Sequence, residues 1–310
     1  MAVASTQRSW RSILMSLVHF SRPHTIIATS LQVFTMWLII VGPAWNQPAA
    51  PLILGLTWIA CLALNIFVVG INQVVDVAID RINKPYLPLA AKTMTPTTAM
   101  IINTIAALVG LAVALATGPY LLLTVLVIMA IGAGYSIPPL RLKRVPLAAA
   151  VSIAFARGFL ANVGLALHYA QRLDRPLPIA VTIAVGIFFF GFGLVIALYK
   201  DLPDACGDRA GRIETFTTRL GSVRVLGIGR LILTLCYSVP IALAIWNMPE
   251  GSAIYLLLSH ALLIGLFWFA SLRVDFLSTR SLTHLYTLLW GLFYSEFLVL
   301  AMYAVTRSVL

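Results

Sequence analysis

Long uninterrupted apolar stretches recur along this chain of 310 residues, and they restrict its fold more than any other feature. Each stretch has about 20 residues, enough for an α-helix to cross the roughly 30 Å of hydrocarbon in a bilayer. A backbone inside lipid must satisfy its own hydrogen bonds, and helices do so within one segment. We expect nine membrane-spanning helices, at 24–42, 51–72, 98–116, 119–135, 147–168, 178–198, 225–246, 252–272 and 283–305.

The composition agrees with this class of protein. Hydrophobic residues make up 61% of the chain and charged residues 10%, whereas soluble domains carry about 25% charged residues. No long polar linker separates the apolar stretches, so residues 1–310 are expected to form one polytopic domain with a short basic N-terminal segment at 1–20. The predicted fold is therefore an all-α membrane protein embedded in a lipid bilayer.

Basic residues are distributed unequally between the two sides of the predicted membrane. Of the 21 Lys and Arg residues, seventeen fall in the N-terminal segment and in alternate connections. The opposite side receives Arg172, Arg175 and Arg307. The positive-inside rule then places the N-terminus in the cytoplasm and the C-terminus on the other side. The net charge of +11 is explained by this asymmetry and by attraction to anionic headgroups, so no nucleic-acid partner is predicted.

The first twenty residues are basic and contain serine, but they are too short for a plastid transit peptide. We therefore expect a bacterial membrane, either the cytoplasmic or the thylakoid membrane.

Acidic residues are rare and clustered. The chain has ten, and five of them fall in two runs, Asn72-x3-Asp76-x3-Asp80 and Asp201-x2-Asp204-x3-Asp208. Side chains three or four positions apart share one face of a helix, so each run projects a row of carboxylates. Both runs follow helices that end on the predicted cytoplasmic side, where they can meet. Such carboxylates are typical of sites for hard cations such as Mg²⁺, often shared with a substrate's phosphates.

Cationic side chains stand next to both acidic runs. Lys and Arg can hold phosphate oxygens that metal ions leave free, and they stabilise a departing diphosphate. The candidates on this ground are Arg81, Lys84, Arg141, Lys143, Lys200 and Arg209, with Tyr135 in the segment before Arg141. The alternative for basic residues at this level is anchoring to the membrane surface.

Two motifs are specific enough to carry a family resemblance. The segments NQVVDVAIDRINKPYLPLA at 72–90 and YKDLPDACGDRAGRIETFTTRLG at 199–221 resemble the UbiA superfamily of intramembrane aromatic prenyltransferases. Supporting stretches are FSRPHTIIAT at 20–29, AGYSIPPLRLKR at 133–144 and RGFLANVGL at 157–165. Within the superfamily the chain resembles the homogentisate prenyltransferases, and in particular the cyanobacterial homogentisate phytyltransferases of tocopherol synthesis.

The resemblance implies a bundle of about nine helices around a central cavity with a cytoplasmic cap. It implies Mg²⁺ ions that bridge a prenyl diphosphate to Asn72, Asp76, Asp80, Asp201, Asp204 and Asp208. Ionisation of the diphosphate would then expose an allylic cation to the ring of homogentisate, which loses CO₂. The alternative within the superfamily is a prenyltransferase with another acceptor or another tail. The acceptors to consider are 4-hydroxybenzoate, naphthoate, chlorophyllide and haem, and the tails are geranylgeranyl, solanesyl or longer chains.

Polar residues also occur inside the apolar stretches. Arg157 and Asn162 lie in the fifth stretch, where a charged side chain costs at least about 2.5 kcal/mol and marks a partner or a pathway. We expect Arg157 either to hold the homogentisate carboxylate or to pair with Glu296 in the ninth stretch. Arg22 and His24, where the first stretch begins, are further candidates for substrate contact.

A cation-coupled transporter is the alternative class, because intramembrane carboxylates also mark ion pathways. Transport predicts acids near the bilayer midplane with access from both sides. Here the acids stand at helix ends on one face, and the opposite connections are short and almost uncharged. The pattern therefore favours a prenyltransferase.

Overall fold

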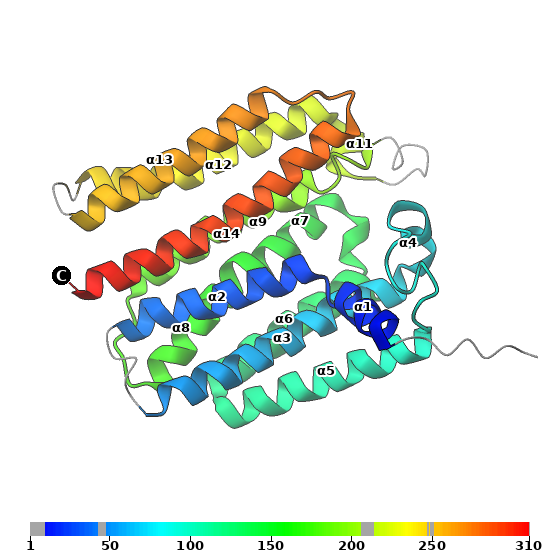
Figure 1. Ribbon diagram of the computed structural model, residues 1–310, viewed down its shortest axis with the longest axis horizontal. Coiled ribbons are helices and arrows are strands. Elements are labelled where there is room, and N and C mark those ends of the chain that lie inside the picture. The colour runs from blue at the N-terminus through cyan, green and yellow to red at the C-terminus, as the bar shows by residue number, and fades with distance from the viewer. Residues whose placement is uncertain (1–9, 43–47, 206–213, 247, 249–250, 310) are drawn as a thin grey trace, which may run out of the picture.

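The structure is a computed structural model that describes residues 10–42, 48–205, 214–246, 248 and 251–309. These residues form helices and connections without any strand (Figure 1). Nine helices of this part of the chain are long and apolar enough to span a membrane, which confirms the prediction of a nine-helix membrane bundle. They are α2 (Pro23–Val41), α3 (Ala50–Val75), α5 (Pro96–Thr117), α6 (Pro119–Ser136), the segment Pro146–Arg172, α9 (Ile179–Tyr199), α12 (Ser222–Trp246), α13 (Gly251–Leu272) and α14 (Thr279–Val309).

Proline marks where many of these helices begin. It stands in the first turn of α2, α3, α5 and α6. Backbone N–H groups there have no acceptor within the helix, so proline loses no hydrogen bond, and its fixed φ suits a helix. The fifth span also begins with proline, at Pro146, and it consists of α7 (Pro146–Ala154), the π-helical turn η3 (Phe155–Leu160) and α8 (Ala161–Arg172). Such π-helical turns are rare in proteins, and those that occur are often found at functional sites.

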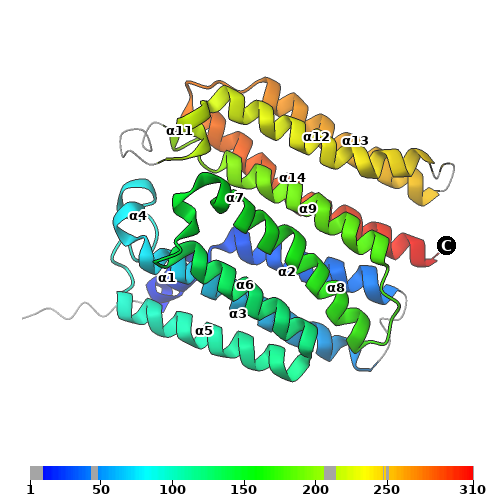
Figure 2. The ribbon, with the colours of Figure 1, turned by 180° about the vertical axis from the view of Figure 1, so that it is seen from behind.

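Shorter helices gather at one end of the bundle. They are α1 (Trp10–Ser21), α4 (Val77–Asn83), η2 (Leu142–Arg144) and α11 (Phe216–Leu220). Figures 1 and 2 show α1, α4 and α11 at the same end, while the C-terminal end of α14 lies at the opposite end. Helix α1 was not predicted, because the N-terminal segment was expected only as a short basic stretch. Among its side chains only Phe20 is buried.

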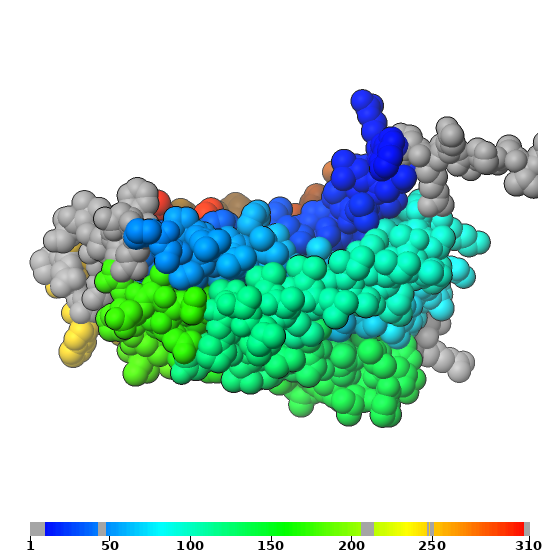
Figure 3. All heavy atoms as spheres, turned by 90° about the horizontal axis from the view of Figure 1, so that it is seen from below, coloured from blue at the N-terminus to red at the C-terminus, as the bar shows by residue number. Residues whose placement is uncertain are grey.

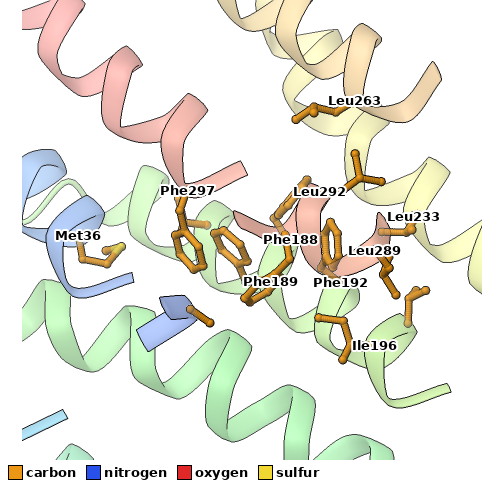
Figure 4. Packing of buried hydrophobic residues seen from close by; sticks show 14 of the residues in the cluster. Met36, Phe188, Phe189, Phe192, Ile196, Leu233, Leu263, Leu289, Leu292 and Phe297 are labelled. Carbon is orange, nitrogen blue, oxygen red and sulfur yellow. The ribbon is translucent and has the colours of Figure 1, made fainter. Parts of the chain in front are cut away.

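Helices α9 and α14 meet in an aromatic core, shown in Figure 4. The rings of Phe189 and Phe297 are stacked, with centroids 4.1 Å apart and an angle of 11° between the planes. Phe188 meets Phe189 edge-on, a favourable arrangement for aromatic quadrupoles. This packing fixes α9, whose last residues lead into the second acidic motif.

Helix α9 also lies against η3 at backbone distance. A Cβ atom added at Gly158 would stand 2.3 Å from the carbonyl oxygen of Phe189. Only glycine permits this approach, because any side chain would overlap the facing backbone. The neighbouring residue Arg157 is thereby held at a fixed position beside α9.

The outer surface of the bundle is apolar. Helix α5, which runs along the face seen in Figure 3, exposes Ile101, Ile105, Leu108 and Leu115. Large exposed apolar side chains at this density are expected where lipid rather than water surrounds the helices. The protein is therefore an integral membrane protein with several spans.

Candidate functional site

A cavity of about 750 Å³ lies inside the bundle, lined by residues of α2, α3, α4, α6, η2, α7, η3, α8, α9, α11 and α14. It brings together most of the residues that the sequence singled out. Those in its lining are Arg22, His24, Asn72, Asp76, Asp80, Lys84, Tyr135, Arg141, Lys143, Arg157, Lys200, Asp201 and Asp204. Asp208 and Arg209 lie outside the described residues.

Two predicted site residues do not line this cavity. Arg81 is exposed on α4, one position beyond Asp80. Asn162 is fully buried, and its side-chain amide donates a hydrogen bond to the carbonyl oxygen of Gly158 at 2.5 Å. This bond spans the junction between η3 and α8, so the amide of Asn162 supports the backbone there. Substrate contact by Asn162 stays a prediction.

The first acidic motif sits where α3 ends and α4 begins. Asp76 interrupts the two helices, with φ −101° and ψ 12°. Its Oδ2 accepts a hydrogen bond from Nδ2 of Asn72 at 3.1 Å, and its Oδ1 lies 2.5 Å from Nζ of Lys143. A guanidinium nitrogen of Arg141 lies 3.7 Å from the same oxygen. Neighbouring side chains thus hold the Asp76 carboxylate from two sides.

Asp80, one turn later on α4, is only 7% exposed. Within the described part of the chain, its carboxylate has no hydrogen-bond or ion-pair partner. Burial raises the pKa of Asp80, and the nearby charges of Lys84 and Arg22 oppose this shift. Burial also lowers the pKa of Lys84. A bound cation would therefore stabilise the carboxylate of Asp80, and a bound anion would stabilise the ammonium of Lys84.

The second motif follows the end of α9 at Tyr199. The ammonium of Lys200 donates a hydrogen bond to the Tyr135 hydroxyl at 3.4 Å and lies 4.0 Å from Oδ1 of Asp201. The interaction with Tyr135 raises the pKa of Lys200, and burial raises the pKa of Asp201. Asp204, one turn further, lines the same cavity. Helix ends far apart in sequence therefore supply one charged site.

The chemistry of the carboxylates suits a hard divalent cation. Among the described residues, no three His, Cys, Asp or Glu side chains converge into a closed metal cage. Mg²⁺ usually binds through one or two carboxylates together with substrate phosphates, rather than through such a cage. Asp76, Asp80, Asp201 and Asp204 all offer oxygen atoms to one cavity. The residues present thus fit a cation shared with a phosphate-bearing ligand.

Arg157 does not contact Glu296, which was one of its two expected partners. Glu296 pairs with His260, whose Nε2 lies 3.0 Å from its Oε1, and both side chains are buried. The expected pairing of Arg157 with Glu296 is therefore wrong. Instead, the Arg157 guanidinium donates a hydrogen bond to Oδ1 of Asn65 at 3.2 Å.

Several cavity residues escaped the sequence reasoning. Asn65 lies seven positions before Asn72 and thus on the same face of α3. Tyr286 and Trp290 are four residues apart on α14, and both line the cavity. The spacing of these residues was the available signal, but a polar or aromatic residue at helical spacing is common in any packed span.

Comparisons with known proteins agree with this arrangement. Residues 32–297 match the UbiA prenyltransferase family. A homogentisate phytyltransferase from Synechocystis sp. is 39% identical over 306 residues, which cover 96% of this chain and 95% of that protein. A chloroplastic homogentisate solanesyltransferase from Arabidopsis thaliana is 34% identical over 290 residues, covering 90% of this chain and 74% of that protein.

A solved structure has the same fold. The structure of a UbiA homolog from Archaeoglobus fulgidus bound to GPP and Mg²⁺ superposes with a TM-score of 0.65 at 17% sequence identity. The match covers 94% of this chain and 99% of that chain. The helical bundle and its order of helices are thus shared over nearly the full length.

Proposed function

This chain belongs to the UbiA prenyltransferase family, and on that premise we propose that it transfers a phytyl group from phytyl diphosphate to homogentisate with loss of CO₂. The observation that carries the proposal is that four aspartates of both motifs line one cavity together with Lys and Arg side chains. Homogentisate is favoured because relatives similar over most of the chain are named for it.

The reaction needs no enzyme nucleophile. The allylic C–O bond of the prenyl diphosphate breaks, and the diphosphate leaves with the electron pair. An electron-rich ring carbon of the acceptor forms a C–C bond with the allylic carbon, and the ring loses the proton at that position. The acetate side chain releases CO₂ and takes up a proton, which leaves a methyl group.

We propose that Asn72, Asp76, Asp80, Asp201 and Asp204 hold Mg²⁺, with Asp208 completing the second motif. When bound, a divalent cation neutralises the negative charge that develops on a leaving diphosphate. Lys143 and Lys200 line the same end of the cavity. Their ammonium groups would hold diphosphate oxygens and lower the energy of the separated charges.

The walls of the cavity suit a reaction through an allylic cation. Apolar side chains such as Val69, Val125 and Ile196 exclude water from the interior, which protects the cation from hydrolysis. The rings of Tyr286 and Trp290 offer faces for cation–π stabilisation. Phytyl is the proposed tail, while geranylgeranyl and solanesyl diphosphates are the tails to compare.

We also propose one domain over residues 1–310, with the N-terminus and active site cytoplasmic and the C-terminus on the opposite side, in a bacterial cytoplasmic or thylakoid membrane. The distribution of Lys and Arg supports this orientation. In a variant with all three native cysteines replaced, an impermeant thiol reagent added to intact cells should label Asp174→Cys and spare Leu277→Cys. The reverse labelling pattern would invert the proposed topology.

The test of the reaction uses purified protein in lipid with Mg²⁺, homogentisate and phytyl diphosphate. Mass spectrometry should detect a decarboxylated, phytylated quinol that disappears with EDTA and in Asp76→Asn. If homogentisate gives no product, then 4-hydroxybenzoate, a naphthoate and chlorophyllide are tried as acceptors. Failure of all acceptors would reject the prenyltransferase proposal and return cation-coupled transport as the alternative.

A further inference from the structure

Among the described residues, Arg157 is the cationic side chain of the cavity that lies within a membrane span rather than at a helix end. Its guanidinium carries five N–H donors. Within the described residues, it makes one hydrogen bond, to Asn65, and no carboxylate lies within ion-pair distance. A guanidinium in a membrane interior normally has a counter-charge. The remaining donors of Arg157 are therefore available to a ligand in the cavity.

Neighbouring side chains fix the position of this guanidinium. The Asn65 amide donates to Oγ1 of Thr25 at 3.0 Å, which turns its carbonyl oxygen towards Arg157. The Gln32 amide donates to the backbone carbonyl of Arg157 at 3.0 Å. Gly158 holds the adjoining backbone against Phe189. Arg157 is thus oriented before any ligand binds, which reduces the entropy lost on binding.

The depth of Arg157 can be measured along α3. Asn65 and Asn72 are seven residues apart on one face of this helix, and both line the cavity. At 1.5 Å per residue they are separated by roughly 10 Å along the helix axis. Asn72 touches Asp76 at the charged end, whereas Asn65 touches Arg157. Arg157 therefore stands well away from the diphosphate end, with room for an aromatic ring between the two.

We propose that Arg157 binds the carboxylate of an aromatic-acid acceptor, so that the acceptor ring lies between this arginine and the prenyl diphosphate. The planar guanidinium suits a carboxylate because two parallel N–H groups can donate to its two oxygens. The inference rests on the proposed function and adds the acceptor subsite to it. Arg157 selects acceptors that carry a carboxylate and sets the distance of their ring from the allylic carbon.

A consequence concerns the release of product. Loss of CO₂ removes the carboxylate that Arg157 binds, so the prenylated quinol retains no charge for this contact. The product should therefore bind the acceptor subsite more weakly than the substrate does, and it should leave towards lipid.

The test compares homogentisate with its uncharged methyl ester in the wild-type protein and in Arg157→Gln. In the wild type the KM for homogentisate should be roughly 10- to 100-fold below that for the ester, the range of hydrogen bonds to a charged group. In Arg157→Gln the preference should disappear. Once the guanidinium is gone, converting the carboxylate into an ester removes no further contact. The KM for prenyl diphosphate should not change.

A matched control removes another arginine from a membrane helix. Arg230 on α12 lies outside the cavity, where it bonds Ser271 and stands over the ring of Trp268. Arg230→Gln should leave the preference for homogentisate intact, so a loss of preference in Arg157→Gln would not be a general effect of a lost arginine. Arg157→Lys keeps the charge without the planar fork and should retain a reduced preference.

Binding without turnover separates this proposal from the proposed reaction. In the absence of prenyl diphosphate, homogentisate should raise the unfolding temperature of the wild-type protein more than the ester does, because a ligand that binds only the native state stabilises it. Equal stabilisation by acid and ester, or a preference that survives in Arg157→Gln, would overturn the role of Arg157. If acid binding depends on Arg157 but no prenylated product forms, the proposed reaction fails and the subsite stands.

Discussion

The Lys143 ammonium lies 2.5 Å from the Asp76 carboxylate, an ion pair that joins positions 67 residues apart in the chain. The contact brings the segment after α6 to the end of α3. A diphosphate bound beside Asp76 would offer Lys143 more negative charge than this single carboxylate does. The pair is therefore a place where substrate binding and the first acidic motif are coupled.

Replacement of Lys143 should weaken binding of the prenyl diphosphate. Lys143→Met removes one charge-assisted contact, so the KM for prenyl diphosphate should rise about tenfold or more while the KM for the acceptor is unchanged. Steady-state kinetics with each substrate varied in turn measure both. Arg224→Gln, at an exposed position on α12, should leave both values as in the wild type. Equal changes in both KM values would argue against a specific role.

Asp76→Asn should lower kcat by about 100-fold or more, since it removes one of the carboxylate charges proposed to hold the divalent cation beside the leaving diphosphate. The asparagine is nearly isosteric, so the variant should insert and elute from size-exclusion chromatography like the wild type. Asp275→Asn, at an exposed position between α13 and α14, is the matched control and should keep full activity. Wild-type turnover in Asp76→Asn would contradict the proposed metal site.

Removal of divalent cations should abolish both turnover and substrate-induced stabilisation. With EDTA present, prenyl diphosphate should no longer raise the unfolding temperature, because its charge would face the unneutralised aspartates. Addition of excess Mg²⁺ should restore the effect. Thermal unfolding followed by tryptophan fluorescence provides the measurement. If prenyl diphosphate raises the unfolding temperature equally in EDTA, the Lys and Arg side chains of the cavity bind the diphosphate without a divalent metal ion.

Gly158→Ala should destabilise the protein, because the added methyl group would overlap the backbone of Phe189 on α9. Overpacking of this kind typically costs about 1–3 kcal/mol. At Gly265 on α13, a Cβ would meet no atom within 4 Å. Gly265→Ala should therefore be tolerated, and the difference in unfolding temperature between the two variants measures the close contact. Equal stability of both would show that η3 can shift away from α9.

The buried pair of His260 and Glu296 should matter for stability and not for acceptor binding. Glu296→Leu leaves the buried His260 ring without the carboxylate that it contacts, and a buried polar group that loses its partner typically costs about 1–3 kcal/mol. The double variant His260→Leu with Glu296→Leu should recover much of this loss. Thermal unfolding tests the recovery, and the KM for homogentisate should match the wild type in the double variant. A raised KM there would connect this pair to the acceptor subsite.

Most of the fold could be predicted because a membrane imposes a length on each apolar segment. The nine expected spans agree with the helices from α2 to α14 within a few residues at each end. That the two acidic runs line one cavity could also be predicted, but not as rows on single helices, because Asp76 interrupts α3 and α4 and residues 201–204 lie in turns. Helix α1 was missed because the segment before the first span was expected only as a short basic stretch, and Arg22 alone separates α1 from α2.

What the sequence by itself determined is therefore the class of the protein, the number of its spans and the two acidic motifs with their basic neighbours. Tertiary structure alone decided which side chains face the cavity. Asn65 rather than Glu296 became the partner of Arg157, and the Asn162 amide donates a hydrogen bond to the backbone of Gly158. The reason is that each helix is apolar nearly all round, so its sequence carries little contrast to set its rotation. Packing against neighbouring helices, such as η3 against α9, sets that rotation instead.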